Sequence, residues 1–249
     1  NMSERPSQGR SRRGASAARR AARARSSVEQ IPYISRKISP YEILDPAGLE
    51  LIEHNAETIL EEIGIEFRDD AEALEILKAA GADVQGERVH FPRGLCRSLI
   101  QQSAPREFIQ HARNPARSVK IGGLHTVLAP AYGSPFIRNL DEGRRYATIE
   151  DFRNFVKLAY LSPTLHHSGG TICEPVDLPV NKRHFDMVYT HMRYSDKPFM
   201  GSVTAPERAQ DTVDMAKILF GDEFIDPQTG QQKTVVISLV NANSPLTWD

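Results

Sequence analysis

The chain has 249 residues, of which 40% are hydrophobic and 25% charged, enough to bury the core of one large domain or two smaller ones. No apolar run approaches the roughly 18 residues that a membrane span needs, so we expect a soluble protein. The two cysteines, Cys96 and Cys173, lie far apart. They indicate neither a disulfide framework nor a thiolate zinc site, and they favour a reducing cytoplasm.

The net charge of −1 conceals an uneven distribution. Residues 1–27 contain eight arginines and a single acidic residue, Glu4, a net charge of +7, which leaves −8 on the rest of the chain. Such a segment can bind nucleic acid, but this one lacks aromatic residues for base stacking and any zinc-finger or helix-turn-helix pattern. Its composition also resembles a mitochondrial transit peptide. We expect residues 1–40 to be a basic, flexible arm, either a free tail or one that embraces a neighbouring subunit of a homo-oligomer.

Residues 41–147 read as an extension of helices followed by β-hairpins. Asp45 and Pro46 open a helix that ends at Gly64, and a second helix from Asp69 or Asp70 to Gly81 forms an α-hairpin with it, burying Leu74, Ile76 and Leu77. A third helix runs through Leu95, Leu99 and Ile100, so the first third of the chain is expected to be helical. The strand candidates that follow are 108–111, 119–121, 126–128 and 136–140, with Gly- and Pro-rich turns between them.

From residue 148 onward, helices alternate with strands. Thr148-Ile149-Glu150-Asp151 predicts a capped helix, followed by strands at 165–171, 199–203 and 235–240 and helices at 181–194 and 206–220. This order predicts a parallel sheet, and the spacing suits a (β/α)8 barrel or a doubly wound sheet.

Only three barrel strands fit before residue 249, so we expect residues 148–249 to be the first three βα units of an incomplete TIM barrel, hence a fragment. In either α/β fold the ligand lies at the carboxyl ends of the strands, here 169–177, 202–205 and 241–248.

Six segments of the chain form a recognisable set: Ala112–Arg117, Ala131–Phe136, Arg144–Thr148, Asp196–Ser202, Ala216–Gly221 and Asn241–Leu246. Together they resemble the trimethylamine methyltransferase family. The resemblance covers essentially the whole chain in order. It implies a TIM barrel with an N-terminal extension, in a chain about twice this length.

The resemblance also implies an activity: methyl transfer from a methylated amine to the Co(I) corrinoid of a separate partner protein. No cofactor would then be bound tightly by this chain. A quaternary amine such as a betaine is the preferred substrate, because loss of a methyl leaves a neutral tertiary amine and requires little acid or base catalysis. Aromatic faces and a few carboxylates would hold the onium group.

Among the candidate substrate-binding residues, Tyr132 lies in a Gly- and Pro-rich turn, where it could form a cation-π wall or pack the hairpin onto the barrel. Phe136 is a similar aromatic candidate, although its strand position favours core packing. Gly169 and Gly170 permit close backbone approach to a ligand, and tight packing explains them equally well. Ser202 lies at the carboxyl end of the second predicted barrel strand, 199–203.

The polar candidates have structural alternatives as well. Glu174 could face an onium charge, as could Asp177, or either could cap a helix beginning near Val180. Asn241, Asn243 and Ser244 end the third strand, where they could bind substrate or form the turn before Pro245.

No catalytic residue and no metal site are predicted. His166 and His167 would point to opposite faces of a strand, and His184 and His191 are about two helical turns apart, so neither pair can chelate one ion. Cys173 reads as a buried structural thiol. Two other functions remain open: a protein or inactive fragment that binds betaines or methylamines without transferring a methyl group, and a nucleic-acid-binding role for the basic arm.

Overall fold

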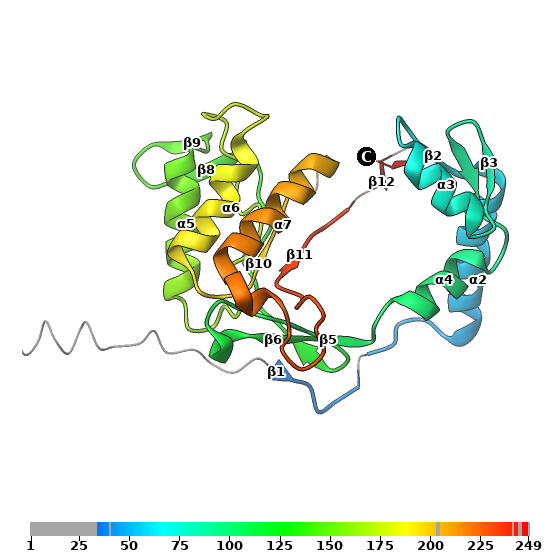
Figure 1. Ribbon diagram of the computed structural model, residues 1–249, viewed down its shortest axis with the longest axis horizontal. Helices are drawn as coiled ribbons and strands as arrows, with labels where there is room; N and C mark the ends of the chain where they lie inside the picture. Colours follow the sequence, from blue (N-terminus) through cyan, green and yellow to red (C-terminus); the bar gives the residue numbers. More distant parts are fainter. Residues whose placement is uncertain (1–33, 40, 203–204, 241, 244–245, 249) are drawn as a thin grey trace, which may run out of the picture.

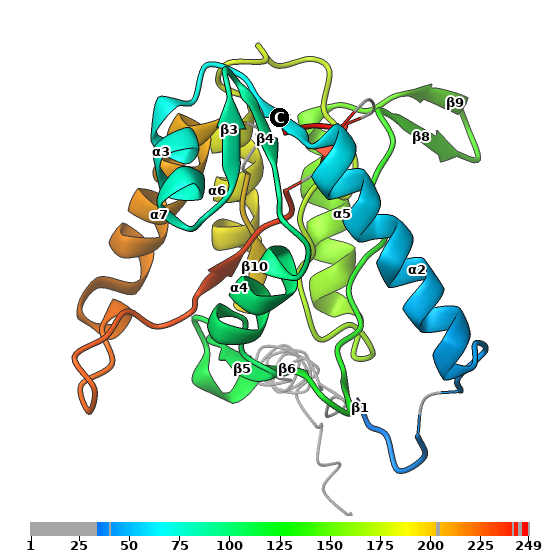
Figure 2. The same cartoon turned by 90° about the vertical axis from the view of Figure 1, so that its right-hand side faces the viewer.

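The computed structural model describes residues 34–39, 41–202, 205–240, 242–243 and 246–248. Figure 1 shows two lobes. The first contains α2, α3, α4 and the strands β2 to β4, and the second contains α5, α6, α7 and the strands β8 to β11. Strands β5 and β6 lie at the base, and Figure 2 shows the first lobe in front of the second.

The predicted arm falls mostly outside the described residues. Within it, β1 (Ile34–Ser35) pairs antiparallel with β7 (His125–Thr126), so this part of residues 1–40 is held against the hairpin region.

Helix α2 (Pro46–Thr58) begins and ends where the sequence predicts. The Asp45 carboxylate accepts a hydrogen bond from the Gly48 amide at 2.7 Å, and the helix continues as one π-helical segment, Ile59–Ile63. Gly64 ends it with a φ of 69°, where a Cβ would lie 2.4 Å from the carbonyl oxygen of Val89. This position therefore requires glycine.

The predicted α-hairpin is wrong, and the first third of the chain is not wholly helical. Strand β2 (Ile65–Phe67) separates α2 from α3 (Ala71–Ala79), and it pairs with β4 (Arg88–His90), which forms a hairpin with β3 (Asp83–Gln85). Each strand has three residues, too few for an alternating pattern to emerge from the sequence. Ile76, expected in the core, is 61% exposed, because α3 packs on this sheet through Leu74 and Leu77 instead.

Helix α4 (Leu95–Ser103) and the hairpin of β5 (Glu107–Gln110) with β6 (Val119–Gly122) follow as predicted. The candidate at 136–140 is β8 (Phe136–Asn139), but its partner β9 (Gly143–Tyr146) was not predicted. Of the candidate at 126–128, only Thr126 lies in a strand, β7, which pairs with β1. Between the first two strands lies the short 3-10 helix Pro115–Arg117.

The second lobe contains the predicted alternation of helices and strands. Helix α5 (Ile149–Leu161) starts at a capping box made by Thr148 and Asp151, and α6 (Arg183–Tyr194), β10 (Phe199–Met200), α7 (Pro206–Phe220) and β11 (Val236–Ile237) follow. Strands β10 and β11 are parallel. A short 3-10 helix, Gly221–Phe224, extends α7. The closed barrel stays a prediction.

The predicted strand at 165–171 is not a regular strand. The Ser168 amide donates to the carbonyl of Pro198 at 2.8 Å, and the Met200 amide donates to that of Gly169 at 2.9 Å, so the segment lies beside β10. Regular pairing is lost because the Gly169 amide instead donates to the Nδ1 atom of His167 at 2.9 Å, with a φ of 88° at Gly169.

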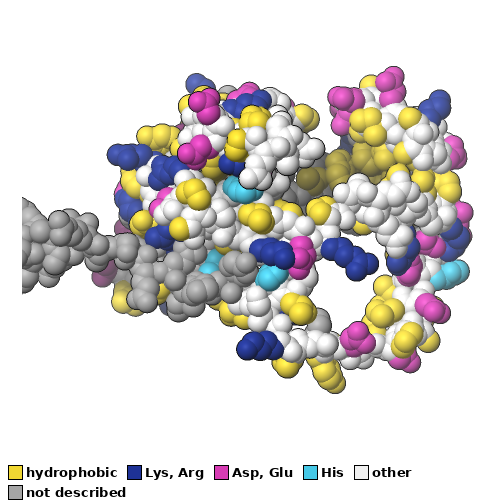
Figure 3. Space-filling view, turned by 60° about the horizontal axis from the view of Figure 1, so that its bottom comes forward, with side chains coloured by type: hydrophobic (Ala, Val, Ile, Leu, Met, Phe, Trp, Pro, Cys, Tyr) yellow, Lys and Arg dark blue, Asp and Glu magenta, His cyan; other side chains and the backbone are white. Residues whose placement is uncertain are grey.

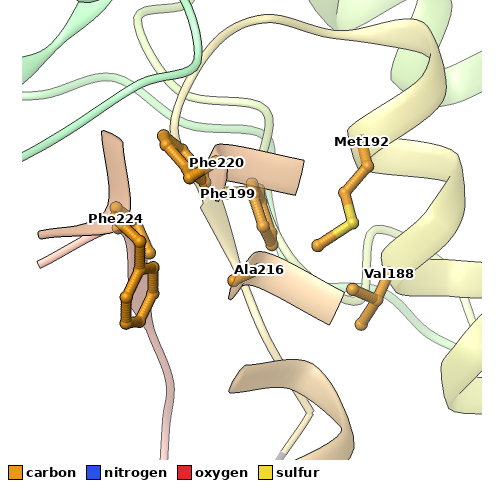
Figure 4. Close-up of a cluster of buried hydrophobic side chains, with 7 residues drawn as sticks. Val188, Met192, Phe199, Ala216, Phe220 and Phe224 are labelled. Atoms are coloured by element: carbon orange, nitrogen blue, oxygen red, sulfur yellow. The ribbon is translucent and has the colours of Figure 1, made fainter. Parts of the chain in front are cut away.

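The core of the second lobe lies between its strands and helices. Figure 4 shows Phe199 of β10 between Val188 and Met192 of α6 on one side and Ala216 and Phe220 of α7 on the other. Phe224 and Val235 complete the cluster. Burial of these apolar side chains is the main force that holds α6 and α7 against the strands.

The last described residues join the first lobe. Strand β12 (Ala242–Asn243) pairs with β13 (Thr247–Trp248), which lies parallel to β2 and completes a five-stranded sheet of order β12-β13-β2-β4-β3. Trp248 stacks on Phe67 with ring centroids 5.6 Å apart. Figure 3 shows acidic and basic side chains mixed over the visible face of the molecule, without one continuous patch of either charge.

Lys197 joins the end of α5 to the start of β10. Its ammonium group is buried and donates to the carbonyl oxygens of Ala159, Ser162 and Leu165 at 2.9, 3.0 and 2.7 Å. Burial lowers the pKa of Lys197 to about 8. Beside it, the Arg117 guanidinium contacts the Asp196 carboxylate at 3.0 Å, which ties the 3-10 helix of the base to the same point.

Replacing Lys197 by methionine tests this junction. Lys197→Met leaves three carbonyl oxygens without their donor, and we expect the free energy of unfolding to fall by about 3 kcal/mol. The matched control is Lys217→Met, which removes an exposed ion pair with Asp214 on α7 and should change stability by roughly 0.5 kcal/mol or less. Urea denaturation followed by circular dichroism measures both, and equal effects would contradict this role.

Candidate functional site

Tyr132 lies across the carboxyl end of the 165–171 segment. Its neighbour Gly133 donates its amide to the carbonyl of Thr171 at 2.8 Å, which holds the turn against that segment. A Cβ on Gly133 would lie 1.8 Å from the carbonyl oxygen of Ile172, so only glycine permits this approach. The Tyr132 hydroxyl donates to the sulfur of Met200 at 2.8 Å. Tyr132 is therefore fixed at both its backbone and its hydroxyl.

The aromatic ring of Tyr132 remains accessible, since the residue is 51% exposed. Partial burial raises the pKa of its phenol, so the side chain stays neutral at physiological pH. A neutral phenol with a fixed orientation and an open side has the properties of a cation-π wall.

Gly170 lies directly beneath this tyrosine. A Cβ at Gly170 would lie 2.7 Å from the Tyr132 hydroxyl and 3.0 Å from the Cβ of Met200. The close approach predicted for Gly170 is thus made by the chain's own Tyr132. Gly169 packs against Pro130, whose ring would lie 3.2 Å from a Cβ at this position. Contact of either glycine with a substrate stays a prediction.

Met200 lies between two hollows of different size. The larger, about 240 Å³, is called the inner hollow and is lined by Ile121, His125, Val127, Ala129, His167, Met200 and Ile237. The smaller, about 20 Å³, is called the small cavity and is lined by Gly170, Thr171, His184, Met187, Val188, His191, Met200, Gly201 and Ser202. The inner hollow is predominantly apolar, whereas the small cavity has space for about one water molecule.

Two predicted residues thus lie at Tyr132 or at the small cavity: Gly170 contacts Tyr132 and lines the cavity, and Ser202 lines the cavity. The Ser202 amide donates to the Thr212 hydroxyl of α7 at 3.3 Å, which places the end of β10 against that helix.

Phe136 and Glu174 are occupied by other partners. Phe136 packs on Tyr146 at 4.6 Å between ring centroids, and the guanidinium carbon of Arg144 lies 4.0 Å from its ring. The Glu174 carboxylate accepts a hydrogen bond from the Arg183 guanidinium, so its charge is already neutralised by α6.

The carboxylate of Asp177 caps a helix, but not the one near Val180. It accepts a hydrogen bond from the Ile149 amide at 2.9 Å, at the start of α5. Asn241 and Ser244 lie outside the described residues. Asn243 is in β12, paired with β13 in the sheet of the first lobe.

The histidines of this region were not predicted to have a role, yet two of them order the backbone beside Tyr132. His167 accepts from the Gly169 amide through Nδ1 and donates through Nε2 to the Gln110 side-chain oxygen at 3.1 Å, while Gln110 donates to the Phe199 carbonyl. Burial lowers the pKa of His167 to about 3 and that of His191 to about 4. Both rings are therefore neutral at physiological pH.

The His166 ring has a different partner from the His167 ring. Its Nδ1 accepts from the Leu128 amide at 3.1 Å, whereas the His167 ring bonds Gly169 and Gln110. Because residues 165–171 do not form a regular strand, the prediction that the two rings point to opposite faces of a strand does not apply. Only the burial of these rings, which a single sequence does not reveal, distinguishes them from surface histidines.

Cys173 is a buried thiol whose pKa is raised to about 12 by burial, so it is not a nucleophile. Among the described residues, no three His, Cys, Asp or Glu side chains are grouped as metal ligands would be. In the same part of the chain, no helix is both long enough and apolar enough to cross a membrane.

Comparison with known proteins identifies the family. A sequence model described as trimethylamine methyltransferase (MTTB) matches residues 12–249. The chain is 46% identical over 209 residues to a glycine betaine methyltransferase of Desulfitobacterium hafniense (strain Y51), which covers 84% of this chain and 42% of the relative. It is 28% identical over 225 residues to a proline betaine:corrinoid methyltransferase of Eubacterium limosum, which covers 87% of this chain and 44% of the relative.

The chain therefore spans less than half the length of these two relatives. The match of the family model extends through the hairpins, Tyr132 and the α/β segment of the second lobe. On the strength of this match and of the 46% identity, the chain belongs to the trimethylamine methyltransferase family.

Proposed function

We propose that the protein carrying this chain transfers a methyl group from a quaternary amine, glycine betaine in the first instance, to the Co(I) corrinoid of a partner protein. Two observations support the substrate class: the relatives named above act on betaines, and the glycine betaine enzyme is the more similar of the two. The observation that carries the proposal in the structure is Tyr132, a neutral, half-exposed aromatic residue whose hydroxyl is held by Met200, which in turn lines an apolar hollow.

This methyl transfer requires little general acid or base catalysis from the protein. The bond between nitrogen and the methyl carbon breaks, its electron pair stays on nitrogen, and a neutral tertiary amine leaves. The reduced corrinoid supplies the nucleophilic electron pair that forms the new bond to the methyl carbon. The protein must orient the cation and exclude water around it.

The described residues suit this task. Tyr132 can face the onium group with its ring, while Met200 and the inner hollow provide apolar surroundings that strengthen the cation-π attraction. Because Glu174 is paired with Arg183, we infer that aromatic and apolar contacts, rather than that carboxylate, hold the positive charge.

We further infer that the second lobe belongs to a TIM barrel. The parallel pair β10-β11, the adjacent 165–171 segment and the helices α5, α6 and α7 support this architecture. Tyr132, Gly170 and Ser202 would then lie at the carboxyl ends of the strands, where barrel enzymes bind their substrates. Cytoplasmic location and assembly into a homo-oligomer are proposed with the function.

A methyl-transfer assay with the natural full-length protein tests the function. The protein is incubated with a reduced corrinoid protein and glycine betaine, proline betaine or trimethylamine, and methyl-cobalt formation is followed by its absorption spectrum. We expect transfer from glycine betaine only when all components are present. Micromolar betaine binding without any transfer would instead indicate a binding protein, and the absence of both would overturn the proposal.

Substitution of Tyr132 tests the aromatic wall. Tyr132→Ala removes the ring and should raise the KM for glycine betaine by roughly 30-fold, the equivalent of about 2 kcal/mol for a desolvated cation-π contact. Tyr132→Phe keeps the ring and loses only the hydrogen bond to Met200, so we expect a change of about 3-fold or less. Steady-state kinetics measure both variants, and equal effects would show that the hydroxyl, not the ring, is what matters.

Substitution of Gly170 tests the close approach. The Cβ of Gly170→Ala would displace the Tyr132 hydroxyl, and we expect KM to rise by roughly 10-fold. Its control is the double variant Gly170→Ala/Tyr132→Phe, in which the hydroxyl is absent and much of the wild-type affinity should return. If the double variant is as impaired as the single one, the clash lies with Met200 and not with Tyr132.

A further inference from the structure

His191 of α6 connects two points of the 165–171 segment. Its Nδ1 atom lies 2.7 Å from the Ser168 hydroxyl oxygen, and its Nε2 atom lies 2.9 Å from the carbonyl oxygen of Gly170. A carbonyl oxygen only accepts hydrogen bonds, so Nε2 carries the proton and donates it. Nδ1 of the neutral ring then accepts from the Ser168 hydroxyl, and both nitrogens are satisfied.

The ring of His191 has no freedom to turn. It is 2% exposed, and it meets Phe152 of α5 edge to face with ring centroids 5.3 Å apart. On another side it stacks on Phe199 of β10 at 6.2 Å and 10° between planes. A buried histidine in such a cage costs more to build than an aliphatic residue, because its polar atoms must be desolvated and fully paired.

The carbonyl of Gly170, which accepts the hydrogen bond from His191, lies next to Tyr132. Gly170 is the residue beneath Tyr132, and the small cavity lies beside it with about 20 Å³ of space. Without the hydrogen bond from His191, the Gly170 peptide could move into that space, and Tyr132 would lose its support.

We propose that His191 is a positioning residue for Tyr132: by holding the Gly170 carbonyl, it fixes the backbone against which the tyrosine lies. The effect of His191 on substrate binding rests on the proposed function, whereas its effect on the orientation of Tyr132 does not. The two can therefore be tested separately.

The first test needs no substrate. Crystal structures of the natural full-length protein with His191→Gln and His191→Leu are compared with the wild type. The glutamine amide can still donate to Gly170, so we expect the Tyr132 hydroxyl to stay at about its wild-type 2.8 Å from the Met200 sulfur. In His191→Leu we expect that contact to be lost. An unchanged Tyr132 in the leucine variant would overturn the proposal.

Ser168→Ala provides a milder variant should His191→Leu fail to fold. It removes the donor to Nδ1 and leaves the Gly170 bond, so a smaller displacement of the same kind is expected. Thr190→Val is the matched control, because Thr190 is also buried on α6 but its hydroxyl donates to the Asp186 carbonyl of the same helix. A displacement of Tyr132 in Thr190→Val as large as that in the His191 or Ser168 variants would show a general loosening of α6 and contradict a specific role for His191.

The second test uses glycine betaine turnover. We expect His191→Leu to raise KM roughly 3- to 10-fold with little change in kcat, and His191→Gln to recover most of the loss. In the Tyr132→Ala background the same leucine substitution should have no further effect on KM, since the residue through which it acts is gone. Additive effects in this double-mutant cycle would refute a role through Tyr132. A wild-type protein without turnover would refute the proposed function and leave the crystallographic test to decide the proposal.

Discussion

The buried ammonium group of Lys197 is the interaction on which the arrangement of the second lobe depends. Its three carbonyl partners lie at the end of α5 and in the chain that leads into residues 165–171, while its own backbone leads directly into β10. One buried ammonium group therefore holds together the starts of two neighbouring segments, residues 165–171 and β10. Gly170 and Met200 lie further along these two segments, and both contact Tyr132. A displacement at the start of the segments would therefore also displace the residues that hold Tyr132.

Residues at the base of the molecule bind the chain next to Lys197. Arg113 donates to the carbonyls of Met192 and Ser195 at 2.9 and 3.2 Å, which closes the last turn of α6, and Asn114 donates to the Asp196 carboxylate at 3.2 Å. The first of the family-like segments, Ala112–Arg117, thus serves to hold helices and strands together. Its polar residues stabilise the scaffold at the end of the strands opposite to Tyr132.

The sequence predicted the helices whose ends are marked by local signals such as capping residues, proline and glycine. Thr148 and Asp151 mark the start of α5, Pro206 marks α7, and Gly64 and Gly81 end helices with positive φ values. It did not predict β2, β3 and β4, because each is three residues long and their pairing depends on contacts between distant residues. Of the candidate site, Tyr132 and Gly170 could be proposed from turn chemistry and from the family resemblance. Met200, His167 and His191 could not, since what gives them their role is their contacts with Tyr132, Gly169 and Gly170, and these contacts form only in the folded chain.

The pairing of β13 with β2 also has a consequence for the order of folding. Thr247 contacts Glu66 across 181 residues of sequence, through a hydroxyl that donates to the carboxylate at 3.3 Å. The sheet of the first lobe cannot be completed until residue 248 has left the ribosome, although β2, β3 and β4 emerge early. Until then the edge of β2 stays open and Phe67 lacks its stacking partner Trp248. Synthesis of the nascent chain therefore passes through a stage in which this edge is exposed to pairing with other chains, the stage at which a chaperone would be of most use.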